Sequence, residues 1–123
     1  MSQEFPFNIY AKDCPSRVFF ERLSDKWSML IIGLLVQETK RFNQLKREVE
    51  GISQKVLSQK LKQLERDGLV HREVQATVPV TVEYSLTPLG VSFTGIIDEM
   101  KVWAEGNVMQ MLEAQREYDL ANA

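Results

Sequence analysis

The stretch GISQKVLSQKLKQLERDGLV, residues 51–70, constrains the fold more than any other part of the chain. Ser53 is a good N-cap, because its hydroxyl oxygen can accept a backbone N–H at the start of a helix. The apolar residues that follow recur at i, i+4 and i+7 and so share one face: Leu57, Leu61 and Leu64. Gly68 ends the pattern, since glycine readily adopts the left-handed conformation found after a helix. The sequence predicts an amphipathic helix with one packed face.

The opposite face of this helix carries amides, hydroxyls and amines and no acid: Gln54, Lys55, Ser58, Gln59 and Lys62. Such side chains suit the major groove of DNA, where they reach base edges and phosphates. A solvated surface helix has the same pattern, and this stretch alone does not separate the two interpretations.

Charge is distributed unevenly along the 123 residues, whose formal net charge is −2. Residues 40–72 hold nine Lys/Arg against four Asp/Glu, whereas the remainder holds six against thirteen. A basic island in an acidic chain concentrates affinity for a polyanion in one place. The overall charge is therefore weak evidence against nucleic-acid binding.

The flanking segments predict a compact set of elements. Residues 1–13 show no clear period and are expected to form an arm. A short helix opens at Cys14-Pro15, an almost wholly apolar helix covers residues 26–36, and a third covers residues 41–49, with residues 37–40 as a polar connection. A tight turn containing Gly51 joins the third helix to the fourth, which is the helix-turn-helix arrangement.

The pattern after Gly68 changes to that of strands. Residues 69–77 and 81–86 are rich in β-branched and aromatic residues, and a turn around Pro79 separates them, which predicts a two-stranded hairpin, or wing. A long helix follows from residue 88 to about residue 118. Its apolar surface exceeds what one small core needs, so we expect a homodimer formed through Phe93, Ile96, Ile97, Met100 and Trp103.

These elements define one domain over residues 14–123 after the arm. The fold class is mainly α with a small β-hairpin (α+β): a winged helix-turn-helix with an N-terminal helix and a long C-terminal dimerisation helix.

Several motifs, in this order, resemble those of the HxlR-type (DUF24) winged-helix transcription regulators of bacteria: CPSRVFFERLSDKWSMLIIGLL, RFNQLKREVEGISQKVLSQKLKQLERDGLVHRE, VPVTVEYSLTPLG and then Trp103. The resemblance covers roughly residues 14–103. It implies a homodimer that binds a two-fold symmetric operator, with the recognition helix in the major groove. Cys14-Pro15 matches the family's N-terminal Cys-Pro, whose cysteine serves in some members as a sensor of electrophiles or oxidants. The resemblance therefore implies that Cys14 is a candidate sensor. The chain departs from the family pattern at Asp25, where a glycine is usual, and at Gln75, Val80 and Thr81 in the wing.

We expect two groups of DNA contacts. The residues at base edges or nearby phosphates are Ser53, Gln54, Lys55, Ser58 and Gln59, since the N-terminal part of a recognition helix points into the groove. The residues expected to anchor phosphates are Lys40, Arg41, Lys62 and Arg72.

Cys14 allows two interpretations. It is either an inert, partly buried residue, or a sensor whose thiol pKa is lowered by the helix N-terminus, with Lys12 and Arg17 near it in sequence. A single cysteine forms no internal disulfide, and with the absence of a secretory signal or a membrane-length apolar run this predicts a cytoplasmic location.

The sequence favours no enzyme, because it contains no phosphate-binding glycine loop, no Cys/His nucleophile motif and no tight carboxylate constellation. His71 is alone, so no metal site and no cofactor is predicted. Two alternatives to a redox-responsive DNA-binding regulator stay open at this point. One is a winged-helix module for protein docking. The other is a regulator that answers to a small electrophile or aromatic ligand near the dimer interface, where Phe19, Phe20, Trp27, Phe93 and Trp103 are the candidate lining residues.

Overall fold

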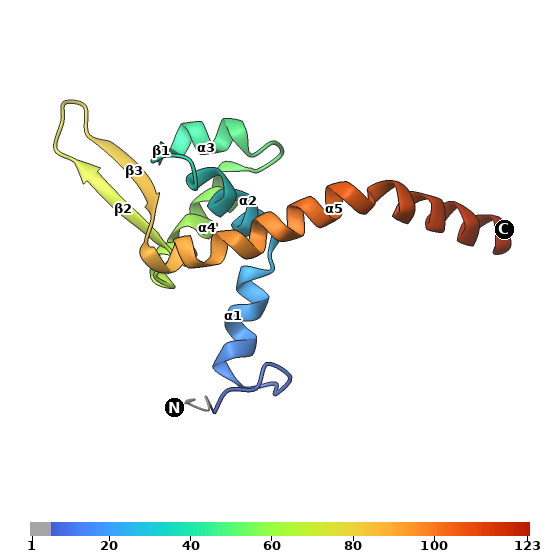
Figure 1. Ribbon diagram of the computed structural model, residues 1–123. Helices are drawn as coiled ribbons and strands as arrows, with labels where there is room; N and C mark the ends of the chain where they lie inside the picture. Colours follow the sequence, from blue (N-terminus) through green and yellow to red (C-terminus); the bar gives the residue numbers. More distant parts are fainter. Residues whose placement is uncertain (1–5) are drawn as a thin grey trace.

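The computed structural model describes residues 6–123 and consists of five helices and three short strands (Figure 1). The elements in chain order are α1 (Pro15–Leu23), α2 (Lys26–Leu35), β1 (Lys40–Arg41), α3 (Phe42–Glu48), α4 (Gln54–Arg66), β2 (Val70–Gln75), β3 (Thr81–Leu86) and α5 (Pro88–Ala121). The predicted fold class is confirmed: a mainly helical winged helix-turn-helix with a long C-terminal helix.

The core forms around α2, as its apolar composition predicts. Ile31 and Ile32 are fully buried and pack in one cluster with the apolar stripe of α4 and with residues of α3 and β2. The cluster consists of Ile31, Ile32, Leu35, Leu45, Val49, Ile52, Leu57, Leu61, Leu64, Leu69 and Val70. Because Leu57, Leu61 and Leu64 are all within it, the opposite face of α4 must face outward.

Both ends of α4 are capped as the sequence predicts. The Ser53 Oγ accepts the backbone N–H of Val56 at 3.1 Å. At the other end Gly68 has a φ of +82°, and its N–H donates to the Glu65 carbonyl at 3.1 Å. The next N–H, that of Leu69, donates to the Leu64 carbonyl at 2.9 Å, which completes a Schellman motif. The helix therefore stops where β2 has to begin.

The sheet contains one strand more than the sequence predicts. The wing strands β2 and β3 pair as expected, with Val70 opposite Leu86 and Gln75 opposite Thr81. The outer edge of β3 also pairs with β1, which gives the antiparallel order β1-β3-β2. The predictions that residues 37–40 form a connection and that the third helix begins at residue 41 were wrong at residues 40 and 41, which form β1. Two residues are too few to show a strand period, and the pairing depends on the distant β3.

Two helices extend away from this body (Figure 1). α5 begins at the N-cap Thr87, whose Oγ1 accepts the Gly90 N–H at 3.1 Å, and runs for 34 residues, a length of about 50 Å. Only its first part packs on the core, through Phe93 and Ile97. α1 projects in another direction and contains no buried residue. No helix in the described part of the chain is long and apolar enough to span a bilayer.

Gly90 generates a prediction about stability. A Cβ added there would collide with the backbone carbonyl of Leu69, in the connection between α4 and β2. We expect Gly90→Ala to lower the free energy of unfolding by about 1–3 kcal/mol, the usual effect of overpacking against atoms that cannot move. Gly95, in the same helix, has no atom within 4 Å of such a Cβ. Gly95→Ala should therefore raise the free energy of unfolding, by about 0.5–1 kcal/mol. Urea denaturation monitored by circular dichroism measures both, and equal effects would contradict the packing argument.

Candidate nucleic-acid interface

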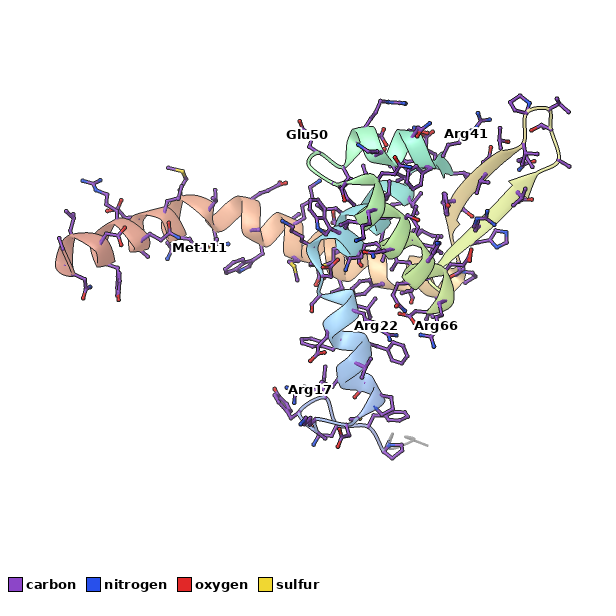
Figure 2. All side chains as sticks on the ribbon, turned by 180° about the vertical axis from the view of Figure 1, so that it is seen from behind. Arg17, Arg22, Arg41, Glu50, Arg66 and Met111 are labelled. Carbon is purple, nitrogen blue, oxygen red and sulfur yellow. The ribbon has the colours of Figure 1, made fainter. Side chains whose placement is uncertain are left out.

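The outward face of α4 presents the predicted polar side chains together. Gln54, Lys55, Gln59 and Lys62 are exposed, and Ser58 is half-buried between them and the body. The Ser53 hydroxyl is already engaged as the N-cap, so it fixes the start of the helix. This side of the molecule is seen in Figure 2, where α4 lies in front of the core.

Exposed cations lie on α4 and on β1, α3 and β2, the elements next to it along the chain. Seven of the nine basic residues of positions 40–72 are exposed, and within residues 6–123 none of them takes part in an ion pair: Arg41, Lys46, Arg47, Lys55, Lys62, Arg66 and Arg72. Figure 2 labels Arg41 beside the strands of the wing and Arg66 near the end of α4. Cations without protein partners are free to pair with an external anion such as phosphate.

Lys40 does not belong to this set, which corrects our expectation that it anchors a phosphate. Its side chain is only 4% exposed, and its Nζ lies 2.9 Å from Glu48 Oε2 and 3.3 Å from Glu38 Oε1. The hydrogen bond to Glu48 raises the pKa of Lys40, with Glu38 acting in the same direction. Lys40 therefore stays charged and ties β1 to α3. The sequence did not reveal this, because Glu48 is eight residues away and the pairing is tertiary.

The register of the sheet separates the two predicted arginine anchors. Residues opposite one another across strands share a face. Arg41 is opposite Glu83, which is in turn opposite Glu73, so all three lie on one face. Arg72 is opposite Tyr84 and lies on the other face, the one that carries Val70. The wing (β2 and β3) therefore carries one arginine against two glutamates and has no net positive charge, and most exposed cations lie on the helices.

Cys14 occupies the N-cap position of α1 and is in contact with the arm. The backbone N–H of Asn8 donates to Cys14 Sγ at 3.2 Å, and the Ser16 Oγ lies 3.1 Å from the same sulfur. The hydrogen bond with Ser16 is the main cause that lowers the pKa of the Cys14 thiol, with backbone N–H groups adding to it. A lowered pKa raises the fraction of reactive thiolate near neutral pH.

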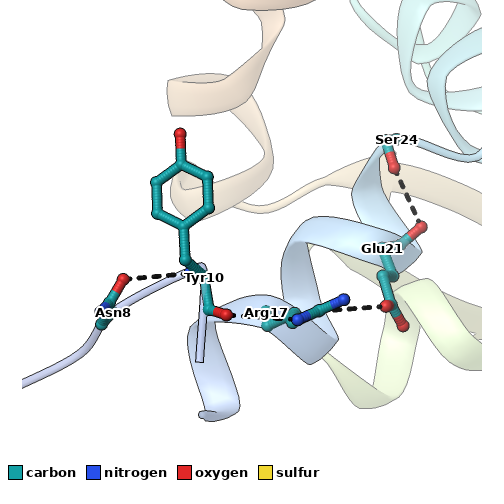
Figure 3. A network of polar contacts seen from close by, with 5 residues as sticks. All are labelled: Asn8, Tyr10, Arg17, Glu21 and Ser24. Carbon is teal, nitrogen blue, oxygen red and sulfur yellow. Dashed lines mark hydrogen bonds and ion pairs between the residues drawn. The ribbon is translucent and has the colours of Figure 1, made fainter. Parts of the chain in front are cut away.

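The arm is tied to α1 by a short polar network (Figure 3). The Asn8 Oδ1 accepts the backbone N–H of Tyr10, and Arg17 Nη1 donates to the Tyr10 carbonyl at 3.3 Å. Arg17 Nε also pairs with Glu21 at 3.7 Å. At the C-terminal end of the network the Ser24 hydroxyl donates to the Glu21 carbonyl. Arg17 thus holds the arm against α1. The pKa of the Cys14 thiol is lowered by hydrogen bonds and not by a neighbouring cation.

The residues predicted to form a dimer interface fall into two groups. Phe93 and Ile97 are half-buried and pack against the chain's own core. Ile96, Met100 and Trp103 are exposed, Trp103 by 60%. The sequence analysis missed a second apolar surface, on α1, where Phe19 and Phe20 are exposed beside Val18. From the sequence, Phe19 and Phe20 were candidates for the lining of a ligand pocket and not for an exposed surface, because the pattern does not show which apolar side chains the fold leaves exposed.

Of the five aromatic residues considered for a ligand pocket, Phe19 and Phe93 line a common groove. It has a volume of about 350 Å³ and lies between α1 and the start of α5, lined by Phe19, Leu23, Asp67, Leu69, Leu89, Ser92, Phe93 and Ile96. Within residues 6–123 no group of three or more His, Cys, Asp or Glu residues is placed to hold a metal ion.

A helix-turn-helix with an outward polar recognition face, exposed cations and a wing defines the class of winged-helix DNA-binding transcriptional regulators, which are not enzymes. The comparison with known proteins identifies the group within this class. The family model described as HxlR-like helix-turn-helix matches residues 22–112, so the chain belongs to that family.

Individual relatives agree with this assignment. The chain is 38% identical over 110 residues to the HTH-type transcriptional regulator YtfH of Escherichia coli (strain K12), covering 89% of this chain and 87% of YtfH. It is similar to the structure of the transcriptional regulator YtfH from Salmonella typhimurium, with a TM-score of 0.82, 41% identity and coverage of 90% of this chain and 98% of that one. The redox regulator HypR in its oxidized form gives a TM-score of 0.71 at 39% identity, covering 76% of this chain and 97% of HypR.

Proposed function

We propose that the protein is a sequence-specific regulator that binds a two-fold symmetric DNA operator as a homodimer. The observation that carries this proposal is the outward face of α4, on which amide, hydroxyl and amine side chains are exposed together with cations that make no ion pair within residues 6–123. In this proposal Gln54, Lys55, Ser58 and Gln59 read base edges, with Ser53 at the entry to the helix. Arg41, Lys62 and Arg72 contact phosphates.

The homodimer is supported by the two apolar surfaces that the chain leaves uncovered. The exposed face of α5 includes Ile96, Met100 and Trp103, which lie within about 60° of one another around the helix. α1 adds Phe19 and Phe20. Apolar surface of this extent on a small soluble domain marks an interaction site, and a two-fold dimer is the commonest way to cover it.

Protein docking without DNA is the weaker alternative. A docking module has no need to concentrate seven exposed cations within residues 41–72 of an otherwise acidic chain. Membership of a family of HTH-type regulators also favours DNA binding over protein docking.

Two single substitutions test the DNA interface. Gln54→Ala should lose about 1–3 kcal/mol of discrimination at one base pair of each half-site, because a glutamine amide pairs with a base edge. Arg41→Ala should weaken binding to all sequences alike and reduce the slope of log K against log[salt] by about one unit for each bound chain, because one phosphate contact is lost. Fluorescence anisotropy on an operator selected from random DNA, across a salt series, measures both quantities.

Lys40→Gln is the matched control for Arg41→Ala. The neighbouring residue also loses a positive charge, but its ammonium is held by Glu48 and Glu38 inside the body. We expect Lys40→Gln to lower thermal stability and to leave the salt slope unchanged. If Lys40→Gln and Arg41→Ala reduced the slope equally, the assignment of Arg41 as the phosphate contact would be wrong. If the wild-type protein selected no DNA at low salt, docking would become the better proposal.

The dimer is tested by placing a charge on the uncovered face of α5. Trp103→Glu should weaken self-association by about tenfold or more, because a large aromatic residue at an interface contributes strongly to affinity. Lys101→Glu is the control, since it lies about 160° away around the same helix. Sedimentation equilibrium measures the mass against that of one 14.2 kDa chain. A wild-type protein that stays at this mass at micromolar concentration would contradict the dimer.

The environment of Cys14 favours a redox input as the regulatory signal. The hydrogen bond with Ser16 lowers the pKa of the thiol, and the similarity to HypR, described as a redox regulator, points the same way. Oxidation or alkylation would remove Cys14 Sγ as the acceptor for Asn8 N–H and so release a contact between the arm and α1.

Cys14→Ser and Ser16→Ala together test this input. Cys14→Ser should bind the operator normally and stop responding to diamide. Ser16→Ala removes the group that lowers the pKa, so its alkylation profile should shift to higher pH and its reaction near neutral pH should slow. Ser24→Ala is the control, because the Ser24 hydroxyl bonds to a carbonyl at the other end of α1. A Cys14→Ser protein that responds to diamide as the wild type does would exclude the thiol as sensor.

A further inference from the structure

The direction of α1 depends on its last turn. None of its nine residues is buried, and Figure 1 shows it projecting from the body. Leu23 is the apolar residue at its base that packs against the core. A helix attached in this way would pivot about the junction with α2 unless other contacts held it.

One such contact joins α1 to the end of the recognition helix. Arg22 Nη1 lies 3.1 Å from Asp67 Oδ1 and 3.4 Å from Oδ2. Gln63 Nε2 donates to the same Oδ1 at 3.1 Å. The Asp67 side chain is only 9% exposed, and Asp67 is the C-cap residue of α4. Figure 2 accordingly places Arg22, at the base of α1, near Arg66 at the end of α4.

A second contact lies on the other side of the junction. Asp25 is the N-cap of α2, where its Oδ2 accepts the Ser28 N–H at 3.1 Å. The same oxygen lies 3.2 Å from Lys60 Nζ on α4. Lys60 and Asp67 are seven residues apart, which is two turns or about 10 Å along α4 and places them on nearly the same face.

In one ion pair α4 supplies the acid, and in the other it supplies the base. This arrangement fixes the position of α4 along its axis relative to the junction. Arg22 and Asp25 flank the junction, while their partners Asp67 and Lys60 are two turns apart on α4. Sliding α4 in one direction would bring Lys60 toward Arg22, sliding it in the other would bring Asp67 toward Asp25, and like charges repel in either case. The pairs therefore hold α4 in one position relative to both helices.

We propose that these two ion pairs form a clamp that fixes the angle between α1 and α4 and so sets the half-site spacing that the dimer reads. The proposal rests on the proposed function, because it assumes that α1 helps to form the dimer and that α4 reads the DNA. The four clamp residues act as positioning residues without touching DNA. Because Lys60 pairs with Asp25, it is not assigned a phosphate contact, although it lies on the recognition helix.

The link from the clamp to spacing is geometric. In the proposed dimer the exposed side chains of α1 are placed against the partner, so the angle between α1 and α4 would help to determine the distance between the two recognition helices. Each base pair inserted between half-sites moves them apart by about 3.4 Å and rotates them by about 35°. A rigid clamp rejects such an insertion, whereas a loosened clamp tolerates it.

The experiment compares operators that differ only in spacing. Wild-type protein first selects an operator from random DNA, and affinity is then measured on that operator and on versions with one base pair inserted or removed at its centre. We expect the wild type to bind the altered spacings about tenfold more weakly. Arg22→Ala should narrow this ratio to about threefold while keeping the same half-site sequence preference. Arg17→Ala is the matched control, because Arg17 pairs with Glu21 within α1.

A charge swap guards against simple misfolding. The pair Arg22→Asp with Asp67→Arg restores opposite charges, so the double variant should recover the wild-type ratio that each single reversal loses. The clamp would be overturned, and the proposed function left intact, if Arg22→Ala and both single reversals kept the wild-type ratio of affinities between the selected and the altered spacings. A wild-type protein that bound all spacings equally would have the same consequence. Loss of affinity in the double variant with no recovery of the ratio would also overturn it. Failure of the wild type to select any DNA would overturn the proposed function itself.

Discussion

Burial of one face of α4 against α2 is the interaction on which the rest of the structure depends. Leu57, Leu61 and Leu64 are packed in the same cluster as Ile31 and Ile32, and this packing decides which side chains of α4 face solvent. Burying such leucines contributes on the order of 1.5–3 kcal/mol each. A rotation of α4 about its axis would expose this stripe, so the outward polar face is held by the core and not by any contact of its own.

The elements with local signals were predictable from the sequence. The caps of α4 at Ser53 and Gly68 depend on residues within one turn, and so does the start of α5 at Thr87. β1 and the burial of Lys40 were not predictable, because both depend on partners brought together only by the fold. The same limit applies along α5, where the period shows that Phe93, Ile96 and Ile97 are apolar but does not show where the core ends.

Ion pairing reduces the number of basic residues in residues 40–72 that are available to contact phosphate. Lys40 and Lys60 contribute to its charge, yet each is held by carboxylates of the body, Lys40 by Glu48 and Glu38 and Lys60 by Asp25. A count of basic residues therefore overestimates the number of potential phosphate contacts, whereas their exposure and pairing identify those that are free. The acidic residues have a positive role here, because they fix two lysines as parts of the scaffold that supports the others.

α2 contacts both α4 and α5, so the helix proposed to read DNA and the helix proposed to form the dimer share one support. Such an interior is close-packed, and a displacement of α5 or α2 cannot be absorbed without moving their neighbours. The outer ends of α1 and α5 lack such packing, since their apolar side chains remain exposed. Covering those ends with a second chain would fix α1 and α5 relative to the body, and through α2 and the junction at Asp25 it would also fix α4. Dimerisation and the geometry of DNA recognition are therefore expected to be coupled in this fold, with the rigid core as the link between them.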